Sequence, residues 1–87
     1  MPYIKQELRD ELDSDISEII EDIVNKPVEI QDGMLNYTIT KVLSGLYEPN
    51  YFNFNRAIGV LEMVKQEFYR RLVGPYENLK IIENGDI

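Results

Sequence analysis

Apolar residues recur at helical spacing between residues 54 and 76, and this stretch constrains the fold more than any other. Five large apolar side chains lie three, four or seven residues apart there, namely Phe54, Ile58, Leu61, Phe68 and Leu72. This spacing stacks them on one side of an α-helix. It is the longest periodic segment of the chain, so we expect the other helices to pack against it.

Two further segments have helical spacing. Residues 5–24 carry a stripe of leucine and isoleucine that Asp13, Ser14 and Asp15 interrupt, and these residue types prefer to cap helices. The pattern fits one helix, or a short turn over residues 5–11 followed by a helix from about Ser14, and the capping residues favour the second interpretation. Residues 33–47 are amphipathic with helical spacing, although their β-branched residues would also suit a strand.

The remaining segments are short and polar or contain proline. The sequence predicts an extended arm at residues 1–4, a loop at 25–32, a turn at 48–53 and an irregular tail at 77–87. Asn53 or Asn55 can cap the long helix, which Gly74–Pro75 should end or kink. We therefore predict one all-α domain over residues 1–87, with three helices per subunit.

The chain has 87 residues and contains neither cysteine nor histidine. Disulfides, zinc sites and Cys–His or Ser–His catalytic pairs are thereby excluded. A chain of this length buries only about 60–65% of the surface that its unfolded form exposes, so it needs additional burial. We expect a homo-oligomer.

The net charge of −7 is concentrated at the N-terminal end. Residues 1–32 hold ten acidic and three basic groups, whereas residues 33–76 hold three acidic and five basic groups. An acidic chain is a poor partner for duplex nucleic acid, but its positive middle could bind one compact anion. No apolar run reaches the length of a membrane span, so we expect no membrane partner and a cytoplasmic location.

One cluster of basic and aromatic residues lies at the end of the long helix. Arginine suits phosphate oxygens and aromatic rings can stack on a base, so the candidate ligand-binding residues are Lys65, Tyr69, Arg70, Arg71 and Tyr76. The simpler interpretation is that Lys65 pairs with Glu62 and that the arginines complement the helix dipole.

A second set of residues could contact another subunit. Gly59 and Met63 lie together on the side of the helix opposite the apolar stripe, with Val60 beside them, and Tyr37 lies on the outer side of the preceding helix. Glycine inside a helix costs roughly 1 kcal/mol relative to alanine, and its lack of a side chain would let another backbone approach. The candidate oligomer interface is therefore Tyr37, Gly59, Val60 and Met63.

Catalysis and metal binding have little support in the sequence. Only Glu62 is a candidate for a carboxylate with a raised pKa, which a general acid needs. The acidic residues of the N-terminal segment lack the spacing and the glycine of an EF-hand loop. We expect no enzyme, no cofactor and no metal, with a small hydrolase using Glu62 as a minor alternative.

The chain resembles a group of short, largely uncharacterised proteins found in phage, prophage and metagenomic sequences. The resemblance rests on the segments 1–4 (MPYI), 35–40 (LNYTIT), 58–62 (IGVLE) with Lys65, 68–71 (FYRR), 75–77 (PYE) and 83–86 (ENGD), and Gly74 stands where alanine is expected. It covers nearly the whole chain but implies no settled activity. A looser analogy of size, class and expected oligomerisation links it to phage sponge proteins, which sequester the nucleotide signals of bacterial immune systems.

Two functions follow as hypotheses. The first is a non-catalytic, phage-derived anti-defence protein that sequesters a small nucleotide-like anion in a pocket near a subunit interface. The alternative is an adaptor or inhibitor that binds a host or phage protein. If the chain is phage-encoded, either function would be performed in the host cell cytoplasm.

Overall fold

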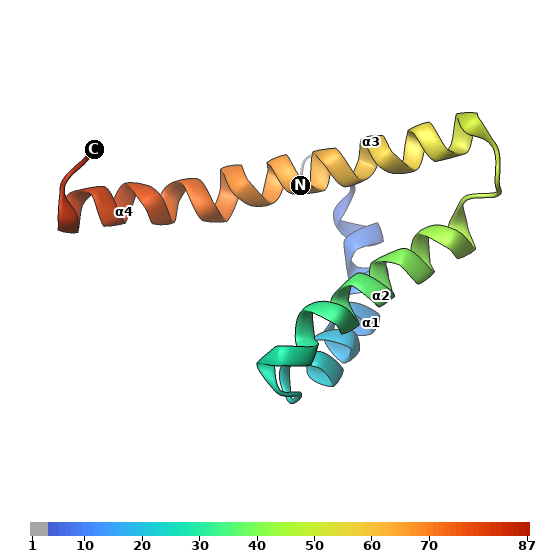
Figure 1. Ribbon diagram of the computed structural model, residues 1–87. Helices are drawn as coiled ribbons and strands as arrows, with labels where there is room; N and C mark the ends of the chain where they lie inside the picture. The colour runs from blue at the N-terminus through green and yellow to red at the C-terminus, as the bar shows by residue number, and fades with distance from the viewer. Residues whose placement is uncertain (1–3) are drawn as a thin grey trace. The chain divides into compact units, whose positions relative to one another are not determined.

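All regular secondary structure in the described part of the chain is helical. The structure is a computed structural model that describes residues 4–87, so most of the predicted N-terminal arm lies outside the described residues. The helices are α1 (Gln6–Val24), α2 (Val28–Leu46), α3 (Tyr51–Phe68) and α4 (Gly74–Asn84), with a π-helical segment η1 (Tyr69–Val73) between the last two (Figure 1). Residues 4–87 contain no strand, which confirms the predicted all-α class.

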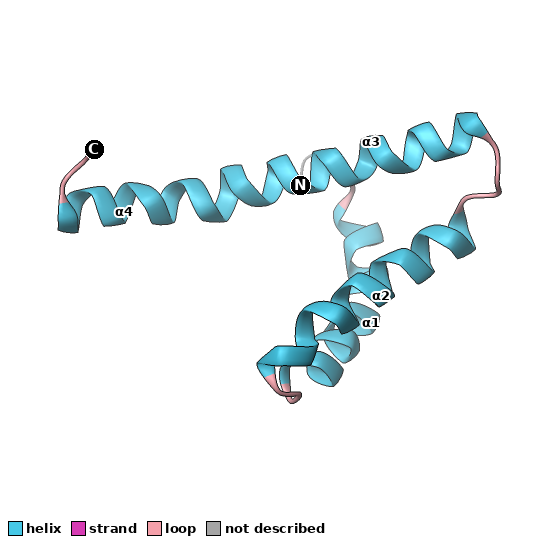
Figure 2. Cartoon of the chain, viewed as in Figure 1, coloured by secondary structure: helices cyan, strands magenta, loops and turns pink. Residues whose placement is uncertain are grey.

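The chain divides into two compact units, Met1–Val42 and Leu43–Ile87, which are described separately. Short non-helical connections join α1 to α2 and α2 to α3 (Figure 2).

In the first unit, α1 is one uninterrupted helix, so the favoured prediction of a turn followed by a shorter helix is wrong. Asp13, Ser14 and Asp15 are exposed, which lets these polar side chains stay in water without ending the helix. Leu12 and Ile16 lie four residues apart on either side of them, so the apolar stripe continues through the interruption. The spacing of the apolar residues therefore decides the helix here, and the capping preference of Asp13, Ser14 and Asp15 does not end it.

The turn between α1 and α2 is much shorter than the predicted loop at residues 25–32. The Asn25 side chain donates to the Glu21 carbonyl at 3.0 Å, and the Gln31 side chain donates to the Lys26 carbonyl at 2.9 Å. The Ile30 amide already bonds to the Pro27 carbonyl at 3.0 Å. Proline is well suited to a helix start because its fixed φ is helical and its missing N–H is not needed there. The helix therefore begins at Val28 and not at Gly33.

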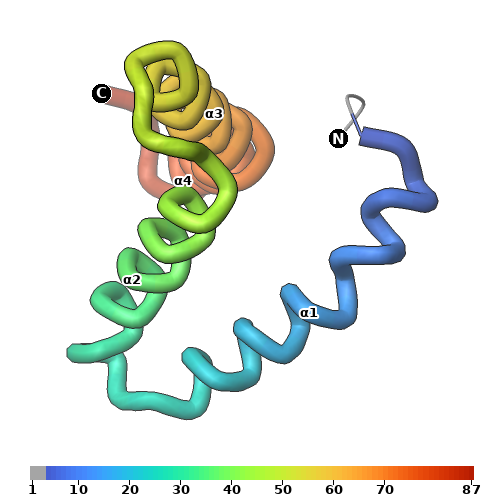
Figure 3. The backbone as a smooth tube through the Cα atoms, turned by 90° about the vertical axis from the view of Figure 1, so that its right-hand side faces the viewer, coloured from blue at the N-terminus to red at the C-terminus, as the bar shows by residue number. Residues whose placement is uncertain are grey.

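From this turn, α1 and α2 diverge along their lengths (Figure 3). Close to the turn, Ile23 of α1 and Met34 of α2 are half-buried, but no described residue of this unit is buried. The two helices thus share only a narrow apolar seam next to their connection.

In the second unit, Asn50 caps the start of α3. Its side-chain oxygen accepts from the Asn53 amide at 2.8 Å, while the Asn53 side chain donates to the Glu48 carbonyl at 3.1 Å. The Arg56 guanidinium lies 5.3 Å from the centre of the Tyr47 ring and ties the turn to the helix. The expectation that Asn53 or Asn55 provides the cap is wrong, because the helix begins at Tyr51.

The long helix of this unit runs through Gly74–Pro75 without ending, since α3, η1 and α4 follow one another directly (Figure 1). Helical structure reaches Asn84, so the predicted irregular tail is wrong for residues 77–84. Gly85 ends the helix with a φ of 85°, and its amide bonds to the Ile81 carbonyl at 2.8 Å. A kink at Gly74–Pro75 stays a prediction.

Burial is minimal in both units. Among the described residues only Ala57 is buried, with 7% of its surface exposed. Leu43, Tyr47 and Asn53 around the α2–α3 turn, and Leu61 further along α3, are half-buried. Large apolar side chains remain exposed on every α-helix and on η1. The amphipathic patterns therefore form helices here without forming a hydrophobic core.

Candidate functional site

The candidate ligand-binding residues lie on consecutive turns of the long helix, on α3, η1 and α4. The π-helical turn between them is marked by the Gly74 amide, which bonds to the Tyr69 carbonyl five residues earlier. Pro75 has no N–H to donate, and its ring would clash with the carbonyl of the residue four positions before it in a regular α-helix. A π-turn is one way in which a helix absorbs such a residue, and such turns often occur at functional sites.

Both arginines of the site contact the same carboxylate. Arg70 Nη2 donates to Glu67 Oε1 at 3.1 Å, and Arg71 Nε donates to Glu67 Oε2 at 2.9 Å. The hydrogen bond from Arg71 is the main cause that lowers the pKa of Glu67 from its usual value of 4.5; desolvation opposes it, and the hydrogen bond from Arg70 and the charges of both arginines lower the pKa further. Regular α-helical geometry separates successive residues by about 100°, whereas the structure brings the guanidinium groups of Arg70 and Arg71 to the same carboxylate.

Lys65 forms a separate pair one turn earlier. Its Nζ lies 3.2 Å from Glu62 Oε1, and both side chains are largely exposed. The hydrogen bond from the Gln66 side chain lowers the pKa of Glu62, and the hydrogen bond and charge of Lys65 lower it further. A general acid at neutral pH needs the opposite shift, so the expectation of a raised pKa at Glu62 is wrong.

The two tyrosines of the site are on different helical segments and have different partners. The Tyr69 hydroxyl donates to Glu77 Oε1 at 3.1 Å, and this bond raises the pKa of the phenol above its usual 10.0. The Tyr76 ring lies 5.5 Å from Lys80 Nζ, which also pairs with Glu83 at 3.0 Å. Each ring keeps an exposed surface.

The structure therefore unites only part of the predicted site. Arg70 and Arg71 meet at Glu67, whereas the contacts of Lys65, Tyr69 and Tyr76 are to Glu62, Glu77 and Lys80. Sequence reasoning missed Glu67 and Glu77 as partners. Glu67 could have been found from its spacing of three and four residues to the arginines. Glu77 could not, because its distance from Tyr69 depends on the π-turn.

The four candidate interface residues are open to solvent. Tyr37, Val60 and Met63 are exposed, and a Cβ atom added at Gly59 would meet nothing within 4 Å. Gly59 has no packing role within the described chain that would explain its cost to the helix.

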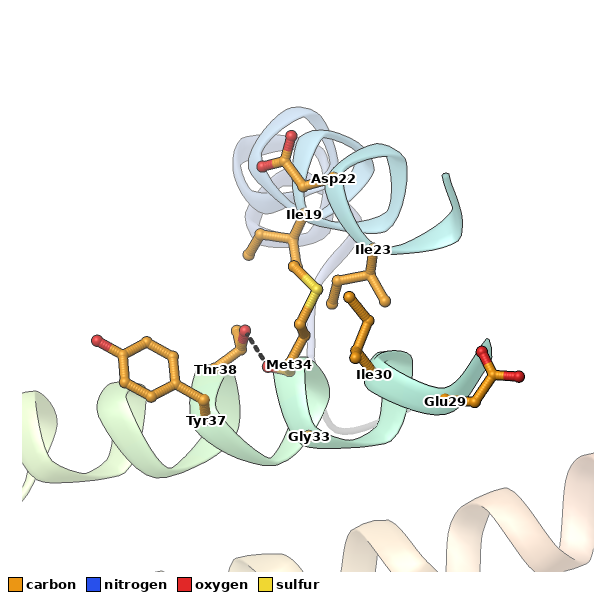
Figure 4. A pocket seen from close by; sticks show the side chains of 9 residues that line it. All are labelled: Ile19, Asp22, Ile23, Glu29, Ile30, Gly33, Met34, Tyr37 and Thr38. Atoms are coloured by element: carbon orange, nitrogen blue, oxygen red, sulfur yellow. Dashed lines mark hydrogen bonds between the residues drawn. The ribbon is translucent and has the colours of Figure 1, made fainter. Parts of the chain in front are cut away.

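The seam between α1 and α2 forms a groove of about 650 Å³ that the sequence did not reveal. Ile19 and Ile23 of α1 point towards Ile30 and Met34 of α2, while the carboxylate of Asp22 is directed away from the seam (Figure 4). The Thr38 hydroxyl donates to the Met34 carbonyl at 2.8 Å, so this polar group of the lining is satisfied within its own helix. The groove is apolar and suits another hydrophobic surface better than a nucleotide.

No group of three or more acidic side chains in residues 4–87 is placed to hold a metal ion. None of the described helices is long and apolar enough to cross a bilayer.

Comparison with known proteins gives one result. No curated protein and no solved structure matches the chain. A family model matches all of it, from residue 1 to residue 87, and its description, "Domain of unknown function (DUF6899)", names no activity. The chain belongs to this DUF6899 family.

Proposed function

We propose that this chain is a non-catalytic interaction protein that binds other protein chains through its exposed helix faces, beginning with copies of itself. One observation carries the proposal: only Ala57 is buried among the described residues, while apolar side chains lie exposed along every α-helix. Contiguous exposed apolar surface of this kind marks protein–protein contact sites.

A second copy of the chain is proposed as the first partner, because each unit taken by itself leaves its apolar stripes uncovered and a second copy supplies stripes of the same kind as cover. One self-contact is proposed at Gly59, Val60 and Met63, where the bare backbone of Gly59 admits a neighbouring helix closely.

Sedimentation equilibrium across a range of micromolar concentrations tests this function. The expected result is a mass of at least twice 10.2 kDa, with a melting temperature that rises with protein concentration because folding and association are linked. Gly59→Leu should weaken the assembly. A stable monomer whose cooperative melting does not depend on concentration would overturn the proposal.

Anion binding is the second candidate, and the convergence of Arg70 and Arg71 on Glu67 favours it. Both arginine side chains remain accessible, with 68% and 45% of their surfaces exposed. A small nucleotide-like anion, of the kind that sponge proteins sequester, would displace the Glu67 carboxylate and take its donors. It ranks second because each cation of the site already has an acidic partner.

A further inference from the structure

We propose that α1 of one copy packs its apolar stripe against α3 of a second copy, and that the two copies exchange this contact reciprocally. The inference rests on the proposed function, since it names the surfaces through which copies of the chain meet.

The stripe on α1 continues beyond the groove that it shares with α2. Its members lie three or four residues apart, namely Leu8, Leu12, Ile16, Ile19 and Ile23. Ile19 and Ile23 point towards α2, but the rest of the stripe belongs to the part of α1 that diverges from α2 (Figures 3 and 4). Leu8, Leu12 and Ile16 are exposed, so the first unit provides no cover for this end of the stripe.

One edge of this stripe is acidic. Glu11, Asp15 and Asp22 lie along the same side of it, within about 80° of Ile19 at 100° per residue. Across its whole length α1 carries eight acidic groups and a single basic group, Arg9. Packing two α1 stripes together would bring two acidic edges into proximity, so like-with-like docking is disfavoured.

The second unit carries a matching stripe of opposite electrostatic character. Spacings of three and four residues alternate along α3 in Phe54, Ala57, Leu61, Val64 and Phe68, as in the seam of a helix pair. Ala57 is buried and Leu61 is half-buried, but Val64 and Phe68 are 54% and 58% exposed.

Lys65 borders this open end of the stripe, about 40° from Leu61. α3 itself carries two basic and two acidic groups, and η1 adds Arg70 and Arg71, so the segment from Tyr51 to Val73 has a net charge of +2 and is complementary in charge to α1. The proposed contact thus pairs two apolar stripes, with the acidic edge of α1 beside Lys65. The α3 stripe faces away from Gly59 and Met63, so both proposed self-contacts fit in one assembly.

Salt dependence gives the first test. If α1 packs on α3, raising sodium chloride from 50 to 500 mM favours the association of Lys65→Glu more than that of Lys80→Glu, which has the same net charge, because only the first variant places a like charge beside the acidic edge of α1. An equal salt dependence of the two variants overturns the inference, while leaving self-assembly intact.

Two charge reversals of equal size give the second test. Lys65→Glu and Lys80→Glu each change the net charge from −7 to −9, and each removes one helical ion pair, to Glu62 or to Glu83. We expect Lys65→Glu to weaken association about tenfold and Lys80→Glu less than threefold. Circular dichroism confirms that both variants keep wild-type helicity, and equal effects overturn the inference.

Zero-length carbodiimide coupling of a mixed ¹⁴N/¹⁵N sample locates the contact directly. The expected products are mixed-isotope peptides that join Lys65 to Glu11, Asp15 or Asp22. If these links occur only within one isotope, α1 packs on its own chain and the inference is overturned. If no association occurs in any condition, the proposed function itself fails, so the two failures are distinguishable.

Discussion

The backbone amide of Gly74 donates its hydrogen bond to the carbonyl of Tyr69, and a Cβ atom built at Gly74 would lie 3.4 Å from that same oxygen. The longer, five-residue hydrogen bond lets the helix pass Pro75, which has no N–H of its own. The glycine has φ −58° and ψ −53°, which are ordinary helical values that any residue can adopt.

Gly74→Ala is therefore expected to stabilise the chain by up to about 1 kcal/mol, because alanine loses less backbone entropy in a helix than glycine. The contact at 3.4 Å is ordinary van der Waals distance and leaves room for the methyl group. Thermal unfolding at fixed protein concentration measures the change. Gly85→Ala is the matched control with the opposite sign, since the φ of 85° at Gly85 is costly for a residue with a side chain. A destabilising Gly74→Ala would show that the π-turn needs a bare backbone.

Asn50→Ala should destabilise the second unit by about 1 kcal/mol, because it removes the side-chain oxygen that accepts from the Asn53 amide. Asn55→Ala is the control, since Asn55 lies inside α3 and alanine favours a helix interior. Urea unfolding followed by circular dichroism compares the two variants. Equal losses would contradict the assignment of Asn50 as the cap.

The Glu67 carboxyl should titrate below 4.5, and Arg71→Ala should raise its pKa more than Arg70→Ala, because the hydrogen bond from Arg71 is the largest cause of the shift. A carboxyl whose pKa is lower in the folded state stabilises that state fully above its unfolded pKa. This contribution is lost as the pH falls through the folded pKa, so the loss is confined to acid below about pH 4.5. Carbon-detected NMR titration of the side chain measures all three values. A Glu67 pKa that is higher in Arg70→Ala than in Arg71→Ala would contradict the structure.

Helical periodicity was sufficient to predict the class of this fold. The stripes on α1, α2 and α3 are readable because apolar residues must recur every three or four positions on one helix face. Boundaries were predicted less well, since proline and asparagine have several roles. Pro27 suits a loop but stands directly before a helix, and Asn50 caps α3 although Asn53 and Asn55 are equally good capping residues by type.

The candidate site could be predicted only where it depends on local spacing. Lys65 and Glu62 pair at three residues, as the simpler interpretation expected. The meeting of Arg70 and Arg71 at one carboxylate was not expected, because regular α-helical geometry separates them by 100°. Exposure was the least predictable property, since an apolar stripe indicates a buried face without indicating which chain covers it.

The convergence of Arg70 and Arg71 allows a sharp test of anion binding. If a nucleotide-like anion uses these guanidinium groups, Glu67 competes with it for the same donors. Glu67→Gln should then strengthen binding, because it removes the competing charge while keeping a side chain of similar shape. Arg70→Ala or Arg71→Ala should weaken binding by roughly ten- to a hundredfold, the value of one charge-assisted hydrogen bond.

Isothermal titration calorimetry with a panel of cyclic and ADP-ribose-derived nucleotides measures each affinity, and circular dichroism confirms unchanged helicity. Intact nucleotide recovered after heat denaturation indicates binding without turnover, whereas a cleaved product that Glu62→Gln abolishes would indicate an enzyme. If the wild-type chain binds none of these nucleotides and Glu67→Gln does not create binding, the arginines serve to hold Glu67 and to complement the helix, and the protein-binding function stands alone.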